Sequence, residues 1–137
     1  MRTVSLEMAK KLKEAGLQHQ IVYGDWYLAW LPTEETYLQK PVLYDYTAYG
    51  PYEEDIWLPT LSDLLEWLEG RGYYWSMHRI VWGDGTNKYL TTVYEMDVQT
   101  GHLEEVQRFV SNTPEDTVAK AVLLLLEQER ESKNGDR

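Results

Sequence analysis

The aromatic side chains are the feature that most constrains what this chain can fold into. Of its eighteen aromatic residues, six are Trp and eleven are Tyr, and Phe109 is the one Phe. All the Trp and Tyr residues lie between Tyr23 and Tyr94. Such a side chain buries a large apolar ring but carries a hydroxyl or N–H group that needs a hydrogen-bond partner. The middle of the chain therefore predicts either a core with polar edges or an aromatic surface that contacts another molecule.

The bulk composition predicts a single globular domain. The chain has 137 residues, of which 43% are hydrophobic and 26% are charged, values close to those of average globular proteins. At this length about two-thirds of the surface of the unfolded chain is buried on folding. We expect one domain over residues 1–131 and a disordered tail over residues 132–137, because chain ends fray where nothing holds them.

What the chain lacks disfavours several classes of protein. It has no cysteine, which excludes disulfides, thiolate metal sites and cysteine nucleophiles and agrees with a reducing compartment. No apolar run approaches the roughly 20 residues of a membrane span. The first residues also lack the continuous apolar stretch of a signal peptide,. We therefore expect a cytoplasmic protein without a membrane partner.

The net charge of −10 bears on the choice of partner. An acidic surface is repelled by phosphate backbones, so we expect no direct binding to nucleic acid. Two alternatives stay open. The chain binds a basic protein, or it acts as an inhibitor that resembles nucleic acid and occupies a nucleic-acid-binding groove.

Capping residues and apolar periodicity predict three helices. Ser5, Thr60 and Thr113 are suited to the N-cap positions,. Gly16 and Gly72 follow the first two helices, as expected of glycines that end a helix in a left-handed conformation,. The apolar stripes consist of Leu6, Met8, Ala9 and Leu12; Leu61, Leu64, Leu65 and Leu68; and Val118, Ala119, Val122, Leu123, Leu125 and Leu126,.

Strand-like runs lie between the first two helices. A Gly-Asp turn at residues 24–25 predicts a hairpin between residues 20–23 and residues 26–31,. Residues 41–46 fit a further strand. Residues 47–55 read as a long loop, which is uncommon unless the loop is mobile or functional.

Three strands are predicted after the second helix, over residues 73–82, 87–98 and 103–110. An Asp-Gly pair at residues 84–85 joins the first two and is a strong hairpin signal,. With this pair as a two-residue turn, one face carries Tyr73, Trp75, Met77, Arg79 and Val81 with Leu90, Thr92, Tyr94 and Met96. The same register gives the other face Ser76, His78, Ile80 and Trp82 with Tyr89, Thr91 and Val93. The first set is the better core face, apart from its arginine.

Tight turns between successive strands imply antiparallel pairing. We therefore predict an α+β fold with a single, largely antiparallel sheet of about five to six strands. Three helices pack on one or both faces of this sheet, in an arrangement like an αβα sandwich.

No constellation of catalytic or ligating residues is visible. His19, His78 and His102 lie in different elements, and none has a carboxylate or a second histidine at metal-ligand spacing,. Ser76 and His78 point the same way along one strand, but strand alternation produces such pairs often by chance. We expect no catalytic residue, no cofactor-binding residue, no metal ligand and hence no cofactor.

The tyrosines that recur between residues 44 and 52 suggest an interaction surface. No buried periodicity is visible for Tyr44, Tyr46, Tyr49 and Tyr52, and Tyr is a favoured contact residue at interfaces. We expect these four residues and Trp57 to form the surface. The alternative is a loop that packs back on its own domain.

The acidic residues beside these aromatics suggest a second kind of site. Glu53, Glu54 and Asp55 lie next to Tyr and Trp residues, a composition that resembles a carbohydrate-binding or glycoside-processing site. Such chemistry needs two carboxylates at a fixed separation, which the sequence does not show.

Three segments resemble small uncharacterised proteins of bacteriophages and prophage-bearing bacteria. They are residues 5–17 (SLEMAKKLKEAGL), 56–68 (IWLPTLSDLLEWL) and 113–121 (TPEDTVAKA). The second half also resembles, more loosely, the phage αβα-sandwich domain. The resemblance implies a phage-associated αβα arrangement and brings no catalytic residue. Together with the missing catalytic constellation, it leads us to expect a non-enzymatic accessory protein that binds another protein.

Overall fold

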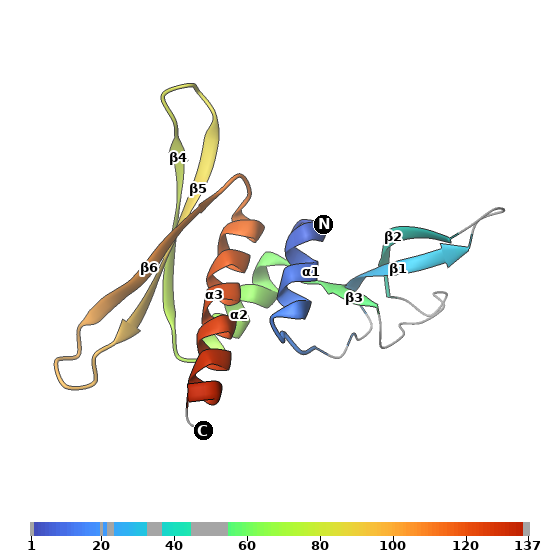
Figure 1. The fold of residues 1–137 in the computed structure, drawn as a ribbon. Helices are drawn as coiled ribbons and strands as arrows, with labels where there is room; N and C mark the ends of the chain where they lie inside the picture. The colour runs from blue at the N-terminus through green and yellow to red at the C-terminus, as the bar shows by residue number, and fades with distance from the viewer. Residues whose placement is uncertain (1, 20, 22–23, 33–36, 45–54, 136–137) are drawn as a thin grey trace.

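Three helices lie between two antiparallel β-sheets (Figure 1). The structure, a computed structural model, describes residues 2–19, 21, 24–32, 37–44 and 55–135. The elements are α1 (Leu6–Glu14), β1 (Trp26–Pro32), β2 (Tyr37–Leu43), β3 (Ile56–Leu58), α2 (Leu61–Gly70), β4 (Tyr74–Val81), β5 (Asn87–Met96), β6 (Leu103–Ser111) and α3 (Pro114–Gly135). This set of helices and strands confirms the predicted α+β class. Helix α3 extends into the range for which the sequence suggests a disordered tail.

The strands form two separate three-stranded sheets, so the predicted single sheet of five to six strands is wrong. In the first sheet β1 lies between β2 and β3, and in the second β5 lies between β4 and β6. Apolar alternation identifies a strand but not its neighbours, because every residue carries the backbone groups that pair. The helices consequently separate two sheets, whereas an αβα sandwich would have them cover one (Figure 1).

The first sheet corrects the predicted hairpin at residues 24–25. Residues 20, 22 and 23 of this hairpin lie outside the described residues. Over Trp26–Leu28 both edges of β1 are paired, one with β3 and the other with β2, so no edge is left for a hairpin partner. On the β2 edge Gly24 N–H donates to the Tyr44 carbonyl (3.0 Å), and Tyr44 N–H donates to the Asp25 carbonyl (2.7 Å). A tight-turn signal is local, and here long-range pairing overrides it.

Strand β2 overlaps only the beginning of the strand predicted over residues 41–46. It contains Pro41, which lies opposite Leu28 of β1. Because β2 is an edge strand, a residue without an N–H group is tolerated there,. Most of the predicted loop over residues 47–55 lies outside the described residues.

The turn between β4 and β5 has three residues, not two. Gly85 N–H donates to the Trp82 carbonyl (2.9 Å), and Trp82 N–H donates to the Thr86 carbonyl (2.9 Å). Gly85 has φ +86°, the left-handed conformation that closes such a loop with a bulge. The extra residue shifts the register by one, so Trp75 lies opposite Val93, and the predicted face sets are wrong,.

Local capping chemistry begins and ends the helices as predicted. The Ser5 hydroxyl accepts from Met8 N–H (3.2 Å), and Thr60 forms a reciprocal capping box with Asp63,. Gly16 follows α1 with φ +102°, and the next N–H, that of Leu17, donates to the Leu12 carbonyl (2.9 Å). This is a Schellman ending, in which a left-handed glycine lets the chain leave the helix.

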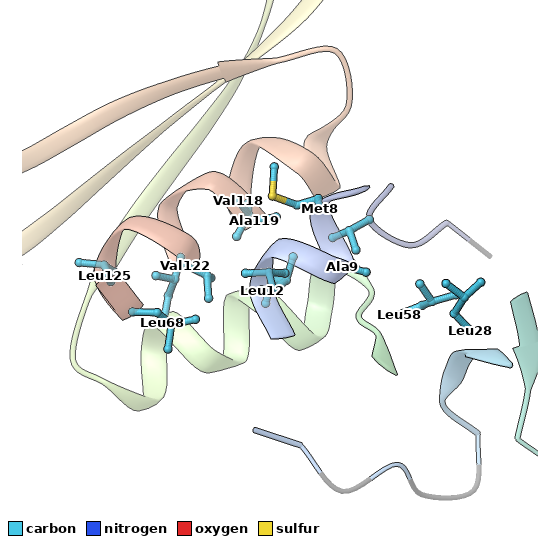
Figure 2. Close-up of a cluster of buried hydrophobic side chains, with 13 residues drawn as sticks. Met8, Ala9, Leu12, Leu28, Leu58, Leu68, Val118, Ala119, Val122 and Leu125 are labelled. Carbon is cyan, nitrogen blue, oxygen red and sulfur yellow. The ribbon is translucent and has the colours of Figure 1, made fainter. Parts of the chain in front are cut away.

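One hydrophobic core joins all three helices and extends to the first sheet (Figure 2). Leu12 of α1, Leu68 of α2 and Val122 of α3 are at most 1% exposed. Leu28 and Leu58 bring β1 and β3 into the same cluster. The core therefore uses the apolar stripes that the sequence predicts, except at Leu6, which is 42% exposed and lies outside the core. No helix in the described part of the chain is long and apolar enough to cross a lipid bilayer.

Candidate functional site

The structure describes two of the five residues predicted to form an interaction surface. Tyr44 is half-buried and its ring lies 6.3 Å from that of Tyr27, itself 1% exposed. Trp57 lies opposite Tyr27 in the β1–β3 pairing. Tyr44 and Trp57 thus both neighbour Tyr27. The other three, Tyr46, Tyr49 and Tyr52, lie outside the described residues.

Trp57 is covered by a histidine. The imidazole of His19 stacks on the Trp57 ring with a centroid distance of 3.6 Å and an interplanar angle of 16°. His19 Nε2 lies 2.8 Å from Asp25 Oδ2, so a carboxylate orients the ring. The contact ties the segment after α1 to β3.

A cleft of about 470 Å³ lies beside this stack. It is lined by Ala9, Leu12, Lys13, Gly16, Leu17, Gln18, His19, Ile21, Asp55 and Trp57. Lys13 Nζ donates to the Asp55 carbonyl (3.3 Å) across it. This bond and the His19–Trp57 stack join α1 and the following segment to the first sheet.

Two features of the cleft concern the carbohydrate-binding or glycoside-processing site that the sequence suggests around Asp55. Asp55 is only 8% exposed, and Glu53 and Glu54 lie outside the described residues. Trp57 Nε1 is buried without a hydrogen-bond partner among the described residues. Such a donor costs about 1–3 kcal/mol, which a water molecule or a carbonyl group of a ligand would relieve.

The three histidines lie far apart in the fold. His19 faces the cleft, His78 lies on β4, and His102 lies in the turn before β6. Over the parts of the chain that the structure describes, no three His, Asp or Glu side chains group together in a way that could hold a metal ion.

The second sheet has two different faces. The inner face contacts α3, where the Thr117 hydroxyl donates to the Tyr89 carbonyl (3.4 Å), and it contains the buried side chains of Thr91 and Val93. Trp75 and Met77, on the same face, pack against the core. On the opposite face, which we call the outer sheet face, no described helix or strand covers the sheet (Figure 1).

The outer sheet face is rich in exposed apolar side chains. On this face the strand pairing places Tyr74 beside Tyr94, His78 beside Leu90, and Met96 beside Leu103. The most exposed of its large apolar residues are Tyr74 (46%), Trp82 (47%), Met96 (44%), Leu103 (49%) and Val110 (37%). Its other residues are Ser76, His78, Ile80, Lys88, Leu90, Thr92, Tyr94, Glu105 and Arg108. Solvent-exposed patches of this kind mark interaction sites.

Polar groups in the middle of this face are ordered. The Ser76 and Tyr94 hydroxyls lie 3.3 Å apart, and Arg108 Nε donates to Glu105 Oε1 (2.6 Å). That hydrogen bond and the negative charge of Glu105 raise the pKa of the Arg108 guanidinium above its usual value. The face therefore presents paired polar groups between two apolar ends.

The outer sheet face is a site that the sequence alone does not reveal. The alternation of β4 and β5 is visible in the sequence, but the wrong register distributed its residues over both predicted faces. The signal that could have revealed it is that neither predicted face was polar, although one face of an antiparallel sheet normally meets solvent.

No family model, no curated protein and no solved structure matches this chain.

Proposed function

We propose that this protein is a non-enzymatic accessory protein that acts by binding another polypeptide through the outer sheet face. The observation that supports the proposal is the concentration of exposed apolar side chains on one face of one sheet. Single exposed apolar residues are normal, but several of them gathered on one uncovered sheet face are not. An accessory role in a phage or prophage belongs to the proposal and rests on the sequence resemblance alone.

The chemistry of the face agrees with recognition of a protein surface. Tyr and Trp are enriched in binding hot spots because they bury much area at little cost in side-chain entropy. Tyr74 begins β4 on this face, and Trp82, which directly follows β4 and pairs with Thr86, is placed on the same face by strand alternation,. Their separation provides two aromatic contact points, with hydroxyl and charged groups between them.

Site-specific photo-crosslinking tests this function. A photoreactive amino acid replaces Val110 or Leu103 on the outer sheet face, and Glu127, an exposed residue of α3, serves as the control position. In cells that express the protein, we expect crosslinks to a defined polypeptide from the two face positions and not from Glu127. Absence of any crosslinked polypeptide, or equal crosslinking from all three positions, contradicts the proposal.

A further inference from the structure

We propose that the polypeptide bound by the outer sheet face is a second copy of this chain. Two molecules pack face to face and form a two-fold symmetric sandwich of two three-stranded sheets. This inference rests on the proposed function and names its partner.

The size of the face is sufficient for a small specific interface. The strands of this sheet have 8, 10 and 9 residues. With strands ~4.8 Å apart and a rise of ~3.3 Å per residue, the face measures roughly 14 by 30 Å. Two such faces in contact cover roughly 840 Å² in flat projection, close to the ~1,000 Å² lower limit for a specific interface.

The arrangement of the face is complementary to itself. Consider a two-fold axis that lies midway between the two sheets, perpendicular to the strands and at the level of Thr91 of β5. Rotation about this axis places each strand over the same strand of the partner copy, with the two strands running in opposite directions. The Trp82 end of β4 then faces the partner's Tyr74 end, and both contribute aromatic side chains. Aligned packing of two twisted sheets at about −30° is a standard way to bury such faces.

One pair of opposite charges fits the same arrangement. Lys88, whose ammonium donates to Asn112 Oδ1, lies near one end of the face, and Glu105, which accepts from Arg108, lies near the other. Reversal of the strands brings the ammonium of Lys88 close to the carboxylate of Glu105 in the other copy. Opposite charges placed across an interface favour one orientation over others.

The overall charge distinguishes a second copy from a basic protein. The face carries two cationic residues, Lys88 and Arg108, and one carboxylate, Glu105, whereas the whole chain carries −10. Contact between two such faces therefore keeps most of the acidic surface out of the interface. The two molecules still repel each other at long range, and salt screens this repulsion. A basic partner would be attracted at long range, and salt would weaken its binding.

Sedimentation equilibrium of the wild-type chain is the primary test. The monomer has a mass of 16.2 kDa, and we expect a reversible dimer of twice that mass. Raising NaCl from ~20 to ~500 mM should lower the dissociation constant, because screening removes the net repulsion. A wild-type mass that stays at the monomer value at every concentration and salt level overturns the inference.

Matched charge insertions locate the interface. Val110→Lys and Leu103→Lys place a cation on the face, whereas Val98→Lys makes the same change at a residue that is 94% exposed in the turn between β5 and β6. We expect the two face variants to raise the dissociation constant at least tenfold, since they bury an unpaired charge, with the control unchanged. Circular dichroism checks that each variant is folded. Equal dimerisation of all three variants overturns the inference.

Charge reversal tests the orientation. Lys88→Glu and Glu105→Lys each place like charges across the proposed interface, and we expect each to weaken the dimer about tenfold. The double variant restores opposite charges across the interface and should bind better than either single variant, although Glu105→Lys also removes the acceptor of Arg108. A double variant that binds no better than the single variants contradicts the reversed-strand arrangement.

The two proposals can fail separately. A monomeric wild-type chain whose outer-face positions still crosslink to a different polypeptide overturns the second copy and leaves the proposed function intact. A monomeric chain without crosslinks at this face overturns both.

Discussion

Single residues in the turns of the second sheet control its geometry. Asp84 Oδ1 accepts hydrogen bonds from the Thr86 hydroxyl (2.7 Å) and the Thr86 N–H (3.0 Å). These bonds hold the pKa of the Asp84 carboxyl below its usual value. They also fix the loop beside Gly85, and the loop length determines which side chains of β4 and β5 share a face,.

The acidity of Asp84 gives a prediction at this scale. Thr86→Val removes the hydroxyl donor but keeps the branched side chain and the N–H, so the pKa of Asp84 should rise toward its usual value,. An NMR titration of the carboxyl carbon measures this. Thr100→Val, in the next turn, should leave the titration of Asp84 unchanged. An unchanged value in the Thr86 variant would show that the hydroxyl does not stabilise the carboxylate.

The sign of the pH dependence follows from the direction of the shift. Because the pKa of Asp84 is lower in the folded than in the unfolded state, its contribution to stability is present above the unfolded-state value,. The contribution is lost as pH falls through the folded-state value. In Thr86→Val this acid-induced loss should be smaller.

At the scale of elements, α3 holds both ends of α1. Asp116 N–H donates to the Thr113 cap of its own helix (3.1 Å), while its carboxylate accepts from Ser5 N–H (2.8 Å). At the other end Arg130 donates to the Glu14 carbonyl (2.8 Å). A carboxylate at the N-terminus and a guanidinium at the C-terminus both complement the dipole of α1.

Removal of the Asp116 carboxylate should therefore destabilise the protein. We expect Asp116→Ala to lower the free energy of unfolding by about 1–2 kcal/mol, since it leaves Ser5 N–H without its acceptor and removes a favourable charge from two helix ends,. Urea denaturation followed by circular dichroism measures the change. Asp116→Asn keeps an acceptor oxygen and should lose less; an equal loss would mean that charge alone carries the effect.

At the scale of the whole molecule, one core connects elements from both halves of the chain. Leu68 of α2 is fully buried among α1, α2 and α3 (Figure 2). The same cluster includes Leu28 of the first sheet, and Trp75 of the second sheet packs against it. The two sheets therefore depend on the same packed helices.

A core substitution should accordingly unfold the molecule as a unit. Leu68→Ala should lower the free energy of unfolding by about 2–5 kcal/mol, because it removes buried methyl groups and leaves a cavity. Circular dichroism and Trp fluorescence should report the same single transition. Val98→Ala, at a 94% exposed position, should change stability by less than about 0.5 kcal/mol,. Two separate transitions would show that the sheets are independent.

The sequence could predict the parts of the fold that depend on neighbouring residues. Ser5, Thr60 and Thr113 mark helix starts because a cap acts on N–H groups two or three residues away. The leucine stripes are equally local, since side chains three or four positions apart share a helix face. In the candidate site, the sequence around Trp57 suggests an exposed aromatic residue. The stack of His19 on Trp57 joins residues 38 positions apart, so the sequence does not predict it.

Helix ends, apolar stripes and the existence of most strands were determined by the sequence alone, because each depends on chemistry within a few residues. Only the tertiary structure decided that β1 pairs with β2 and β3, that the strands divide into two sheets, and which sheet face stays uncovered. Backbone pairing groups are the same at every residue, so the choice among partners depends on the packing of the whole chain. A single extra residue in the turn at Gly85 then moves each side chain of β5 to the other face relative to β4, and so changes the surface available for binding,.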